Sequence, residues 1–455
     1  MRGQFLAGGG GEFDGAASDS RLVKPGSLFF ALSGERTDGF EHAGAAARAG
    51  AAGVVVPGGR GVPVGCESIA VIAVPDARVA LGDLARVARA EFAGKVVGVT
   101  GSNGKTTTKE LIAAALGSAG SVLRTEGNYN TDVGMPLTVL GGSGHEAFWV
   151  LEMAMRARGE IDYLTNIARP HVAVVTNVAA AHLGRLGSLE EVARAKGEIF
   201  GGLGPDGVAV LPNDEPRLEP EAARIPEERK RRFGFPEKSG HVDRDVRILE
   251  VVSAGSAGSV VRLAVGDQPV VVRLPLAGEH NARNAAAALA VAAALKVPLL
   301  GAAAGLEKAA LPPHRSRIVA AGGRTILDDC YNANPASMSA ALATVMASVG
   351  SSARAFAVLG DMLELGDEAE SLHRSLGREA AFAGLTGLAA VGDFAAAVAA
   401  GAREAGLTRT MITHDPEAAA AQVADWSSSG DWILVKASRG VRLERAVEAL
   451  QAKLK

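Results

Sequence analysis

Short apolar runs alternate with longer stretches of helical spacing along the whole chain. In the N-terminal part, apolar runs cover residues 28–32, 54–56 and 69–74. Helical stretches cover residues 41–49 and 79–91, and Pro-Gly or Pro-Asp pairs separate the segments, as is typical of turns. This pattern predicts a small α/β domain over residues 1–93.

The middle part of the chain, residues 94–312, predicts a larger α/β domain. Helical stretches alternate with the first three of its strand-like runs, which predicts a mostly parallel, doubly wound sheet. Residues 242–276 change to short alternating strands, which predict an antiparallel flap, and helices are expected over 281–295 and up to about residue 310. The strand-like runs are residues 96–100, 148–153, 172–177 and 208–211.

A third part begins after the linker Leu311-Pro312-Pro313 and extends over residues 313–455. Its apolar runs alternate with helical stretches, so we expect a third α/β domain of Rossmann type. Its first strand is not followed by a Gly-x-Gly-x-x-Gly turn, and we therefore assign no dinucleotide to it. The expected strands are residues 325–328, 355–359, 389–391 and 432–435.

A glycine-rich turn joins the first strand and first helix of the middle part. Backbone N–H groups and a helix N-terminus at such a turn hold phosphate oxygens, while its lysine reaches the β- and γ-phosphates and its threonine can bind Mg²⁺. Val99 stands where the usual motif has a glycine, so the motif is a variant, and an ordinary glycine turn is the alternative. The residues concerned are Gly101, Ser102, Asn103, Gly104, Lys105, Thr106 and Thr107.

Composition narrows the class of protein. The 455 residues include 47 basic and 50 acidic ones, and this net charge of −3 gives no reason to expect a nucleic-acid partner. The two cysteines, Cys66 and Cys330, indicate a reducing compartment, and neither has a Cys or His at metal-site spacing. The most apolar stretch, residues 285–295, is shorter than the roughly 20 residues of a membrane span. We expect a cytoplasmic protein without membrane insertion.

Three further residues of the middle part are candidates for chemistry. Glu152 ends an apolar strand at the carboxyl edge of the sheet, where it could hold Mg²⁺; a solvated carboxylate is the alternative. His182 follows the next strand within a run of small residues and is either structural or a metal ligand. Lys196 lies on a helical stretch, for which a solvated lysine is the default.

Polar residues also begin a helix of the middle part and follow the strands of the third. Asn281 and Asn284 are three positions apart and share a helix face, so their amides could bind an adenine edge, although Asn281 could instead cap the helix. Ligand crevices open at the carboxyl ends of parallel strands. Convergence of three such ends, at residues 328–335, Asp361 and residues 436–439, would form a ligand pocket.

These motifs together resemble the ATP-dependent Mur ligases of peptidoglycan synthesis. Within that family the resemblance is to the members that add D-alanyl-D-alanine to UDP-N-acetylmuramoyl-tripeptide. It implies a monomeric three-domain ligase that works through an acyl phosphate, with a uridine-nucleotide domain, a central ATP and Mg²⁺ domain and a C-terminal ligase domain. Besides the phosphate loop, it rests on residues 19–26, 31–39, 127–130, 195–200, 329–335, 360–366 and 436–439.

The resemblance implies a role for each candidate. Catalysis would use Lys105, Glu152, His182 and Lys196, and the metal would be held by Thr106, Glu152, His182 and a Lys196 carbamylated by CO₂. ATP would bind the phosphate loop and Asn281, Asn284, Asp329 and Arg315, with Arg317 as a neighbouring alternative. The tripeptide nucleotide and D-alanyl-D-alanine would bind Ser20, Arg21, Gly34, Asp38, Gly39, Thr125, Asn128, Asn130, Tyr331, Asn332, Asn334, Lys436, Ser438 and Arg439.

Two other functions are consistent with the same motifs. One is a ligase of the same superfamily that adds a single amino acid, or glutamate to a folate. The other is a nucleotide-dependent binding or regulatory protein that hydrolyses ATP slowly and joins nothing. Only 18 residues, rich in glycine, precede Asp19, where relatives have a fuller helix and strand, so we expect either a misplaced start or the loss of that element.

Overall fold

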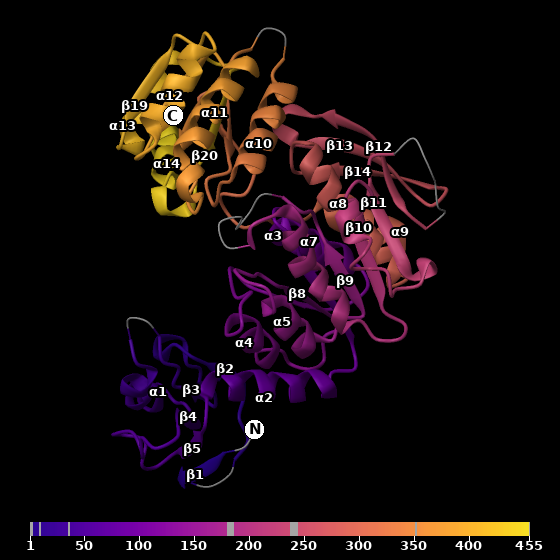
Figure 1. Cartoon of the computed structure of the whole chain (residues 1–455), viewed down its shortest axis with the longest axis vertical. Helices are drawn as coiled ribbons and strands as arrows, with labels where there is room; N and C mark the ends of the chain where they lie inside the picture. Colours follow the sequence, from indigo (N-terminus) through magenta and orange to yellow (C-terminus); the bar gives the residue numbers. More distant parts are fainter. Residues whose placement is uncertain are drawn as a thin grey trace. The chain divides into compact units, whose positions relative to one another are not determined.

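The computed structural model of the chain describes residues 3–8, 11–34, 37–179, 186–236, 244–350 and 353–454. The strands form three sheets, each with helices beside it (Figure 1). By their contacts the residues form two compact units, Met1–Val99 with Gly120–Ala173 and Glu198–Gly207, and Thr100–Ala119 with Val174–Gly197 and Val208–Lys455.

The first sheet has five strands in the order β1-β5-β4-β3-β2. Successive side chains of its strands point to opposite faces: Phe29 packs toward α1 (Ala43–Arg48), whereas Phe30 packs toward α2 (Ala77–Glu91). The three predicted strands are confirmed. The two edge strands β1 and β2 were not predicted, and β1 pairs antiparallel with β5. The strands are β1 (Gln4–Ala7), β2 (Ala16–Ala17), β3 (Leu28–Phe30), β4 (Gly53–Pro57) and β5 (Ala70–Val74).

The central sheet has nine strands in the order β14-β13-β12-β11-β10-β9-β6-β8-β7. The sheet is mostly parallel, as predicted, from β7 to β8 and β6 and from β10 through β11 to β12, although β7 and β11 were not among the predicted strands. The strands are β6 (Lys95–Thr100), β7 (Val122–Arg124), β8 (Phe148–Glu152), β9 (Val172–Val175), β10 (Val208–Pro212), β11 (Lys230–Gly234), β12 (Val246–Ser253), β13 (Ser259–Val265) and β14 (Gln268–Leu274).

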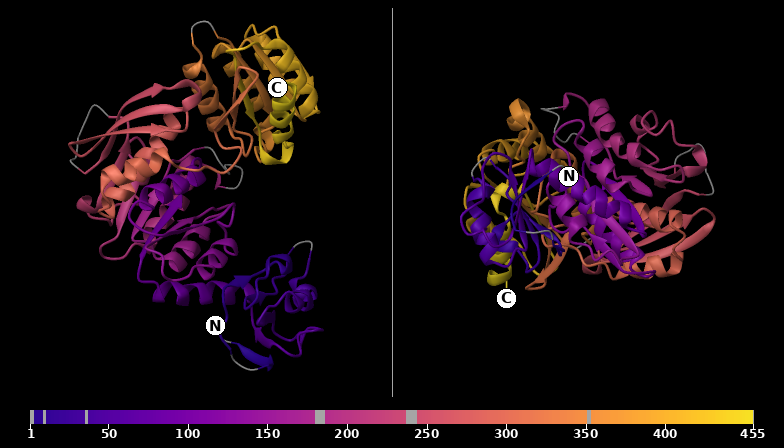
Figure 2. Two further views of the ribbon diagram at one scale, coloured as in Figure 1. Left: turned by 180° about the vertical axis from the view of Figure 1, so that it is seen from behind. Right: turned by 90° about the horizontal axis from the view of Figure 1, so that it is seen from below.

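The expected antiparallel flap is not a separate element. Strands β12, β13 and β14 are antiparallel to one another, but β12 pairs in parallel with β11, so the three strands extend the central sheet (Figure 2). The alanine-rich helix α8 (Glu279–Ala294) packs on β12, and α9 (Leu299–Glu307) packs on β14. Among the described residues, the other α-helices of this part are α3 (Lys105–Leu116), α4 (Gly134–Leu140), α5 (Glu160–Ala168) and α7 (Leu189–Gly197).

The third sheet has six strands in the order β15-β16-β20-β17-β18-β19, and all but β15 are parallel. Alternate residues of β17 pack against helices on opposite faces, which confirms the prediction of a Rossmann-type α/β domain. Strands β15 and β19 were not predicted. The strands are β15 (Arg317–Ala321), β16 (Arg324–Asp328), β17 (Ala355–Gly360), β18 (Gly387–Val391), β19 (Thr410–Thr413) and β20 (Trp432–Lys436).

Two sets of helices enclose the third sheet. One face carries α10 (Pro335–Ser348), α11 (Ala369–Phe382) and α12 (Ala395–Glu404), and the other carries α13 (Pro416–Trp426) and α14 (Glu444–Lys453). Strands β16, β20 and β17 are neighbours, so the loops at their carboxyl ends open side by side. Within the described ranges, none of the helices combines the length and apolar character needed to cross a membrane.

Candidate active site

The turn predicted to bind phosphate lies between β6 and α3. Gly104 precedes the helix with φ of 75°, a left-handed conformation that glycine adopts without strain. Lys105 is the first residue of α3, and its Nζ donates hydrogen bonds to the carbonyl oxygens of Gly101 and Ser102 at 2.8 and 3.2 Å. The turn therefore places a helix N-terminus and a cation at one point, as phosphate binding requires. The first turn of the helix buries Thr106 and Thr107.

The polar residues that follow strand β9 fix the shape of this turn. The backbone N–H of Asn103 donates to Oδ1 of Asn177 at 2.9 Å. The carbonyl oxygen of Asn103 accepts from Oγ1 of Thr176 at 2.6 Å. A Cβ atom on Gly101 would lie 1.8 Å from the same Oγ1, so only glycine fits there. These contacts fix the shape of the turn through Asn103. They leave the N–H groups at the start of α3 available to bind phosphate.

The two asparagines predicted to share a helix face do so on α8. Nδ2 of Asn284 donates to Oδ1 of Asn281 at 3.2 Å, and Oδ1 of Asn284 accepts from Oγ1 of Thr108 on α3 at 3.1 Å. The alternative that Asn281 caps the helix is wrong, because the N-cap is Gly278 and the Asn281 amide donates to the carbonyl of Ala277 at 2.8 Å. The paired amides join α8 to the first turn of α3.

Glu152 is the last residue of β8 and is only 1 % exposed, so the alternative of a solvated carboxylate is wrong. Its Oε1 accepts from Nδ2 of Asn130 at 2.8 Å, and its N–H donates to Oγ1 of Thr125 at 2.9 Å. Within the part of the chain that the structure describes, Oε2 has no hydrogen-bond partner. Glu152 pairs with Val99 of β6, the residue that stands before the phosphate-binding turn. Asn128, which was predicted to bind substrate, is exposed. A buried carboxylate oxygen without a donor suits a cation.

Lys196 lies in α7 and is 2 % exposed, so the default of a solvated helical lysine is wrong. Burial, followed by the positive charge of Lys105, holds the pKa of the Lys196 amine well below its ordinary range. A neutral amine is a nucleophile, in contrast to an ammonium group. His182 lies outside the described residues, and its role stays a prediction.

The carboxyl ends of β16, β20 and β17 bring several predicted residues together. Nζ of Lys436, which is 2 % exposed, lies 2.5 Å from Oδ2 of Asp329 and donates to the carbonyl oxygen of Asn332 at 2.9 Å. The N–H of Ser438 donates to the carbonyl oxygen of Asp361 at 2.9 Å. The three strand ends therefore meet, as the order of the parallel strands predicts.

Tyr331 lies between two arginines in the loop after β16. The guanidinium carbon of Arg315 is 3.7 Å from the centroid of its ring, and that of Arg439 is 5.1 Å away. Nη1 of Arg439 also donates to the tyrosine hydroxyl at 3.2 Å. Arg317, the neighbouring alternative to Arg315, is exposed at the first position of β15. Two cations on one ring suit an anionic ligand such as phosphate or a carboxylate.

Asn334 contacts the phosphate loop directly. Its Oδ1 accepts from the N–H of Ser337 at 2.9 Å and caps helix α10. Its Nδ2 donates to Oδ1 of Asn103 at 2.6 Å, and Nδ2 of Asn103 lies 3.4 Å from Oδ1 of Asn334. This pair links the loop predicted to hold ATP with the loop predicted to hold the amino acceptor.

Four of the five residues predicted to bind the uridine nucleotide lie in or cap two short 3-10 turns of the first sheet's domain, and Gly34 lies outside both turns. Asp38 caps one of them, accepting from the N–H of Phe40 at 3.1 Å, and forms an ion pair with Arg60. Gly39 is tightly packed, since a Cβ there would lie 2.6 Å from the backbone of Leu32. Ser20 and Arg21 form the other turn, and Gly34 donates to the carbonyl of Thr37 at 2.9 Å.

Sequence reasoning missed four residues that position these groups. Thr176 and Asn177 support the phosphate loop, and their place after an apolar strand was the available signal. Arg60 and the half-buried His280, whose Nε2 lies 3.0 Å from Nδ2 of Asn281, carry no such signal. Desolvation lowers the pKa of His280, which favours the neutral ring.

Comparison with known proteins agrees with this arrangement. The family model for the Mur ligase middle domain matches residues 99–292, and that for the Mur ligase, glutamate ligase domain matches residues 314–439. The UDP-N-acetylmuramoyl-tripeptide--D-alanyl-D-alanine ligase of Bacillus subtilis is 37% identical over 439 residues, which cover 96% of this chain and 93% of that protein.

Two crystal structures are similar over nearly the whole chain. A MurF structure from Acinetobacter baumannii has a TM-score of 0.84 at 32% identity, covering 96% of this chain and 93% of that one. The MurF ligase from Thermotoga maritima in complex with ADP has a TM-score of 0.82 at 30% identity, covering 97% of each chain. The chain belongs to the Mur ligase family.

Proposed function

We propose that this protein is an ATP-dependent ligase that adds D-alanyl-D-alanine to UDP-N-acetylmuramoyl-tripeptide. The observation that carries the proposal is similarity over almost the full length to ligases with this activity in their names. The phosphate loop, supported by Asn177 and joined to Asn334, supplies a site for the nucleotide. ADP in the similar Thermotoga maritima structure supports the use of ATP.

The reaction joins a carboxylate to an amine. The terminal carboxylate of the tripeptide attacks the γ-phosphorus of ATP, which gives an acyl phosphate and ADP. The amine of D-alanyl-D-alanine then attacks the acyl carbon, phosphate leaves, and the amine loses a proton. Lys105 and the N–H groups at the start of α3 offset the negative charge on the transferred phosphoryl group. The acyl phosphate must be kept from water until the amine arrives.

We propose that Thr106, Glu152, His182 and Lys196 hold Mg²⁺. Oε2 of Glu152 fits this role because it is buried and, among the described residues, accepts no hydrogen bond. Thr106 follows Lys105 in the first turn of α3. In P-loop proteins the threonine at this position binds the metal through its hydroxyl group. When bound, Mg²⁺ would neutralise charge on the phosphates.

Carbamylation of Lys196 would adapt this residue to a metal site. The neutral amine attacks CO₂, a C–N bond forms, and one proton is released, so that a carbamate anion replaces the neutral amine. The buried position of Lys196 and the low pKa of its amine support this reaction. The carbamate would also place a negative charge that attracts Lys105, and it would be an oxygen ligand of the kind that Mg²⁺ prefers.

The remaining assignments are proposals of the same kind. Residues 1–93 would bind the uridine nucleotide through Ser20, Arg21, Gly34, Asp38 and Gly39, and residues 94–312 would bind ATP through the phosphate loop. Residues 313–455 would hold D-alanyl-D-alanine through Tyr331, Asn332, Asn334, Lys436, Ser438 and Arg439. Asn281, Asn284, Arg315 and Asp329 would contact ATP, and Thr125, Asn128 and Asn130 the muramoyl group. We expect a cytoplasmic monomer.

The test is ADP release in the presence of UDP-N-acetylmuramoyl-tripeptide, with and without D-alanyl-D-alanine, followed by the mass of the product. We expect ADP and the pentapeptide nucleotide to form in equal amounts, and only with all three substrates. Product formed with a single amino acid, or with glutamate and a folate, would indicate the other ligases of the superfamily. Slow ATP hydrolysis that D-alanyl-D-alanine does not stimulate would contradict ligation altogether.

A further inference from the structure

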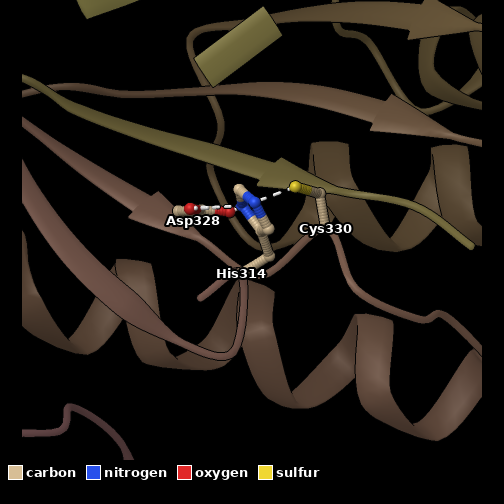
Figure 3. A group of neighbouring side chains, drawn as sticks. All are labelled: His314, Asp328 and Cys330. Atoms are coloured by element: carbon tan, nitrogen blue, oxygen red, sulfur yellow. Dashed lines mark hydrogen bonds and ion pairs between the residues drawn. The ribbon is translucent and has the colours of Figure 1, made fainter. Parts of the chain in front are cut away.

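Three side chains beside the third sheet form a compact cluster that the proposed ligase reaction does not use. His314 lies in the segment before β15, Asp328 ends β16, and Cys330 lies two residues later (Figure 3). Nδ1 of His314 is 2.9 Å from Oδ2 of Asp328, and Sγ of Cys330 is 3.1 Å from Oδ1 of the same carboxylate. One nitrogen, one oxygen and the sulfur all lie within 4.8 Å of one another.

We propose that His314, Asp328 and Cys330 form a binding site for a thiophilic divalent cation, of which Zn²⁺ is the best match. An imidazole, a carboxylate and a thiolate are the three kinds of ligand that Zn²⁺ takes in proteins. Tetrahedral coordination places such donor atoms roughly 3.3–3.8 Å apart, so the cluster needs to close by only about an ångström. Mg²⁺ and Ca²⁺, which take oxygen ligands, do not match this set.

The charges and exposure of the cluster agree with such an ion. A divalent cation with one carboxylate, one thiolate and one neutral imidazole makes a neutral unit, which can be buried without an unpaired charge. Asp328 and Cys330 are each 1 % exposed, whereas the side chain of His314 is 31 % exposed and leaves a route from solvent. Three protein ligands leave one tetrahedral position for water, the pattern of an open zinc site.

A catalytic thiol is a poorer interpretation of the same cluster. Burial and the negative charge of Asp328 raise the pKa of the Cys330 thiol, so the reactive thiolate is disfavoured without a cation. Both Cys330 and His314 are bonded to Asp328 rather than paired as nucleophile and base. A bound cation removes this obstacle, because coordination deprotonates a thiol outright.

The ion would stiffen the loop that carries the proposed ligand-binding residues. The N–H of Tyr331 donates to the carbonyl oxygen of His314 at 3.0 Å, and Asp329 lies in the chain between two of the proposed metal ligands. His314 has φ of 64° and Ser316 has φ of 51°, left-handed conformations that are strained in residues other than glycine. Coordination of His314 would help to hold that segment in place.

The test is a titration of the full chain, freed of metal by a chelator, with Co²⁺ in the absence of nucleotide and Mg²⁺. Thiolate bound to Co²⁺ gives a near-ultraviolet charge-transfer band, which an oxygen and nitrogen site such as the one around Glu152 does not give. We expect one equivalent of Co²⁺ to produce the band, Zn²⁺ to displace it, and Mg²⁺ to leave it unchanged. The readout does not require ligase activity, so it stands or fails separately from the proposed function.

Matched variants identify the ligands. Cys330→Ser should abolish the band, whereas Cys66→Ser, at the other buried cysteine, should keep it. His314→Gln, at a partly exposed position, should fold and weaken Co²⁺ binding by more than roughly tenfold. Absence of the band at saturating Co²⁺, or a band that His314→Gln leaves at full affinity, would overturn the proposal. A band that survives Cys330→Ser would show an adventitious ion only.

Discussion

The ammonium group of Lys436 lies 2.5 Å from the carboxylate of Asp329, although the two residues are 107 positions apart in the chain. Lys436 ends β20 and Asp329 follows β16, the strand beside it in the sheet. The lysine is almost completely buried and also donates to the carbonyl oxygen of Asn332. The ion pair therefore holds together two of the loops that carry the candidate ligand-binding residues.

Removing one partner of this pair should destabilise the protein. Asp329→Asn leaves a buried ammonium group without its counter-charge, and we expect the free energy of unfolding to fall by about 3 kcal/mol. The additional substitution Lys436→Met should recover part of that loss, because it removes the unpaired charge. Urea denaturation at neutral pH measures both changes.

The exposed ion pair between Arg374 and Glu404 provides the control for this prediction. Arg374→Gln should leave the free energy of unfolding almost unchanged, since solvent screens exposed pairs. An Asp329→Asn variant as stable as the Arg374→Gln variant would show that Lys436 does not depend on its partner.

The shape of the phosphate loop should depend on Gly101. An alanine there would place its Cβ 1.8 Å from Oγ1 of Thr176, so the loop must move and lose its bonds to the end of β9. We expect Gly101→Ala to weaken ADP binding at least roughly tenfold, as calorimetry measures. Gly144→Ala is the matched control, because Gly144 has φ of 76° with no atom near its Cβ position.

Gly144→Ala introduces the backbone strain of an alanine at positive φ without a steric clash, so it separates the two effects of Gly101→Ala. Gly144→Ala should cost about 1 kcal/mol of stability and leave ADP binding unchanged. Equal ADP affinity in Gly101→Ala and wild type would contradict the assignment of this turn to phosphate.

If Lys196 is carbamylated, added carboxylic acids should partly restore the activity of a variant that lacks this lysine. Lys196→Ala should lower the rate of ligation by roughly 100-fold, because an anion at the proposed metal site is lost. Short-chain carboxylic acids should restore part of the rate by occupying the space of the carbamate. Lys308→Ala, at an exposed lysine, should leave the rate unchanged and unaffected by the acids. Full activity of Lys196→Ala without added acid would end the hypothesis.

His171 should make stability depend on pH. Burial, with the positive charges of Lys95 and Arg89, lowers its pKa from 6.5 to about 4, and its Nδ1 accepts from the N–H of Val96 at 3.0 Å. The unfolded chain therefore binds a proton below pH 6.5 that the folded chain binds only near pH 4. Stability should be complete above pH 6.5 and decrease as the pH falls toward 4, by roughly 1–2 kcal/mol after allowance for solvent.

Urea denaturation at pH 7.5 and pH 5 measures this dependence. The His171→Gln variant should lose less stability between the two values than wild type does, because glutamine does not take up a proton. His145→Gln, at an exposed histidine, should retain the wild-type dependence. Equal pH dependence in the His171→Gln variant and wild type would refute the prediction.

Local pattern determined much of the architecture of this protein. Apolar runs predicted most of the parallel strands, and strand ends predicted where Glu152, Asp329, Lys436 and the phosphate loop would lie, since period-2 alternation and turn residues are local properties. The edge strand β1 escaped prediction because its stability comes from pairing with β5, which is distant in the sequence.

Burial and long-range contact were decided only by the tertiary structure. A helical lysine such as Lys196 is usually solvated, and nothing near it in the chain indicates that it is 2 % exposed. His314 and Cys330 have no spacing typical of a metal site, yet the hairpin of β15 and β16 brings the segment before one strand to the end of the other. Such neighbours depend on strand register, which long-range packing selects.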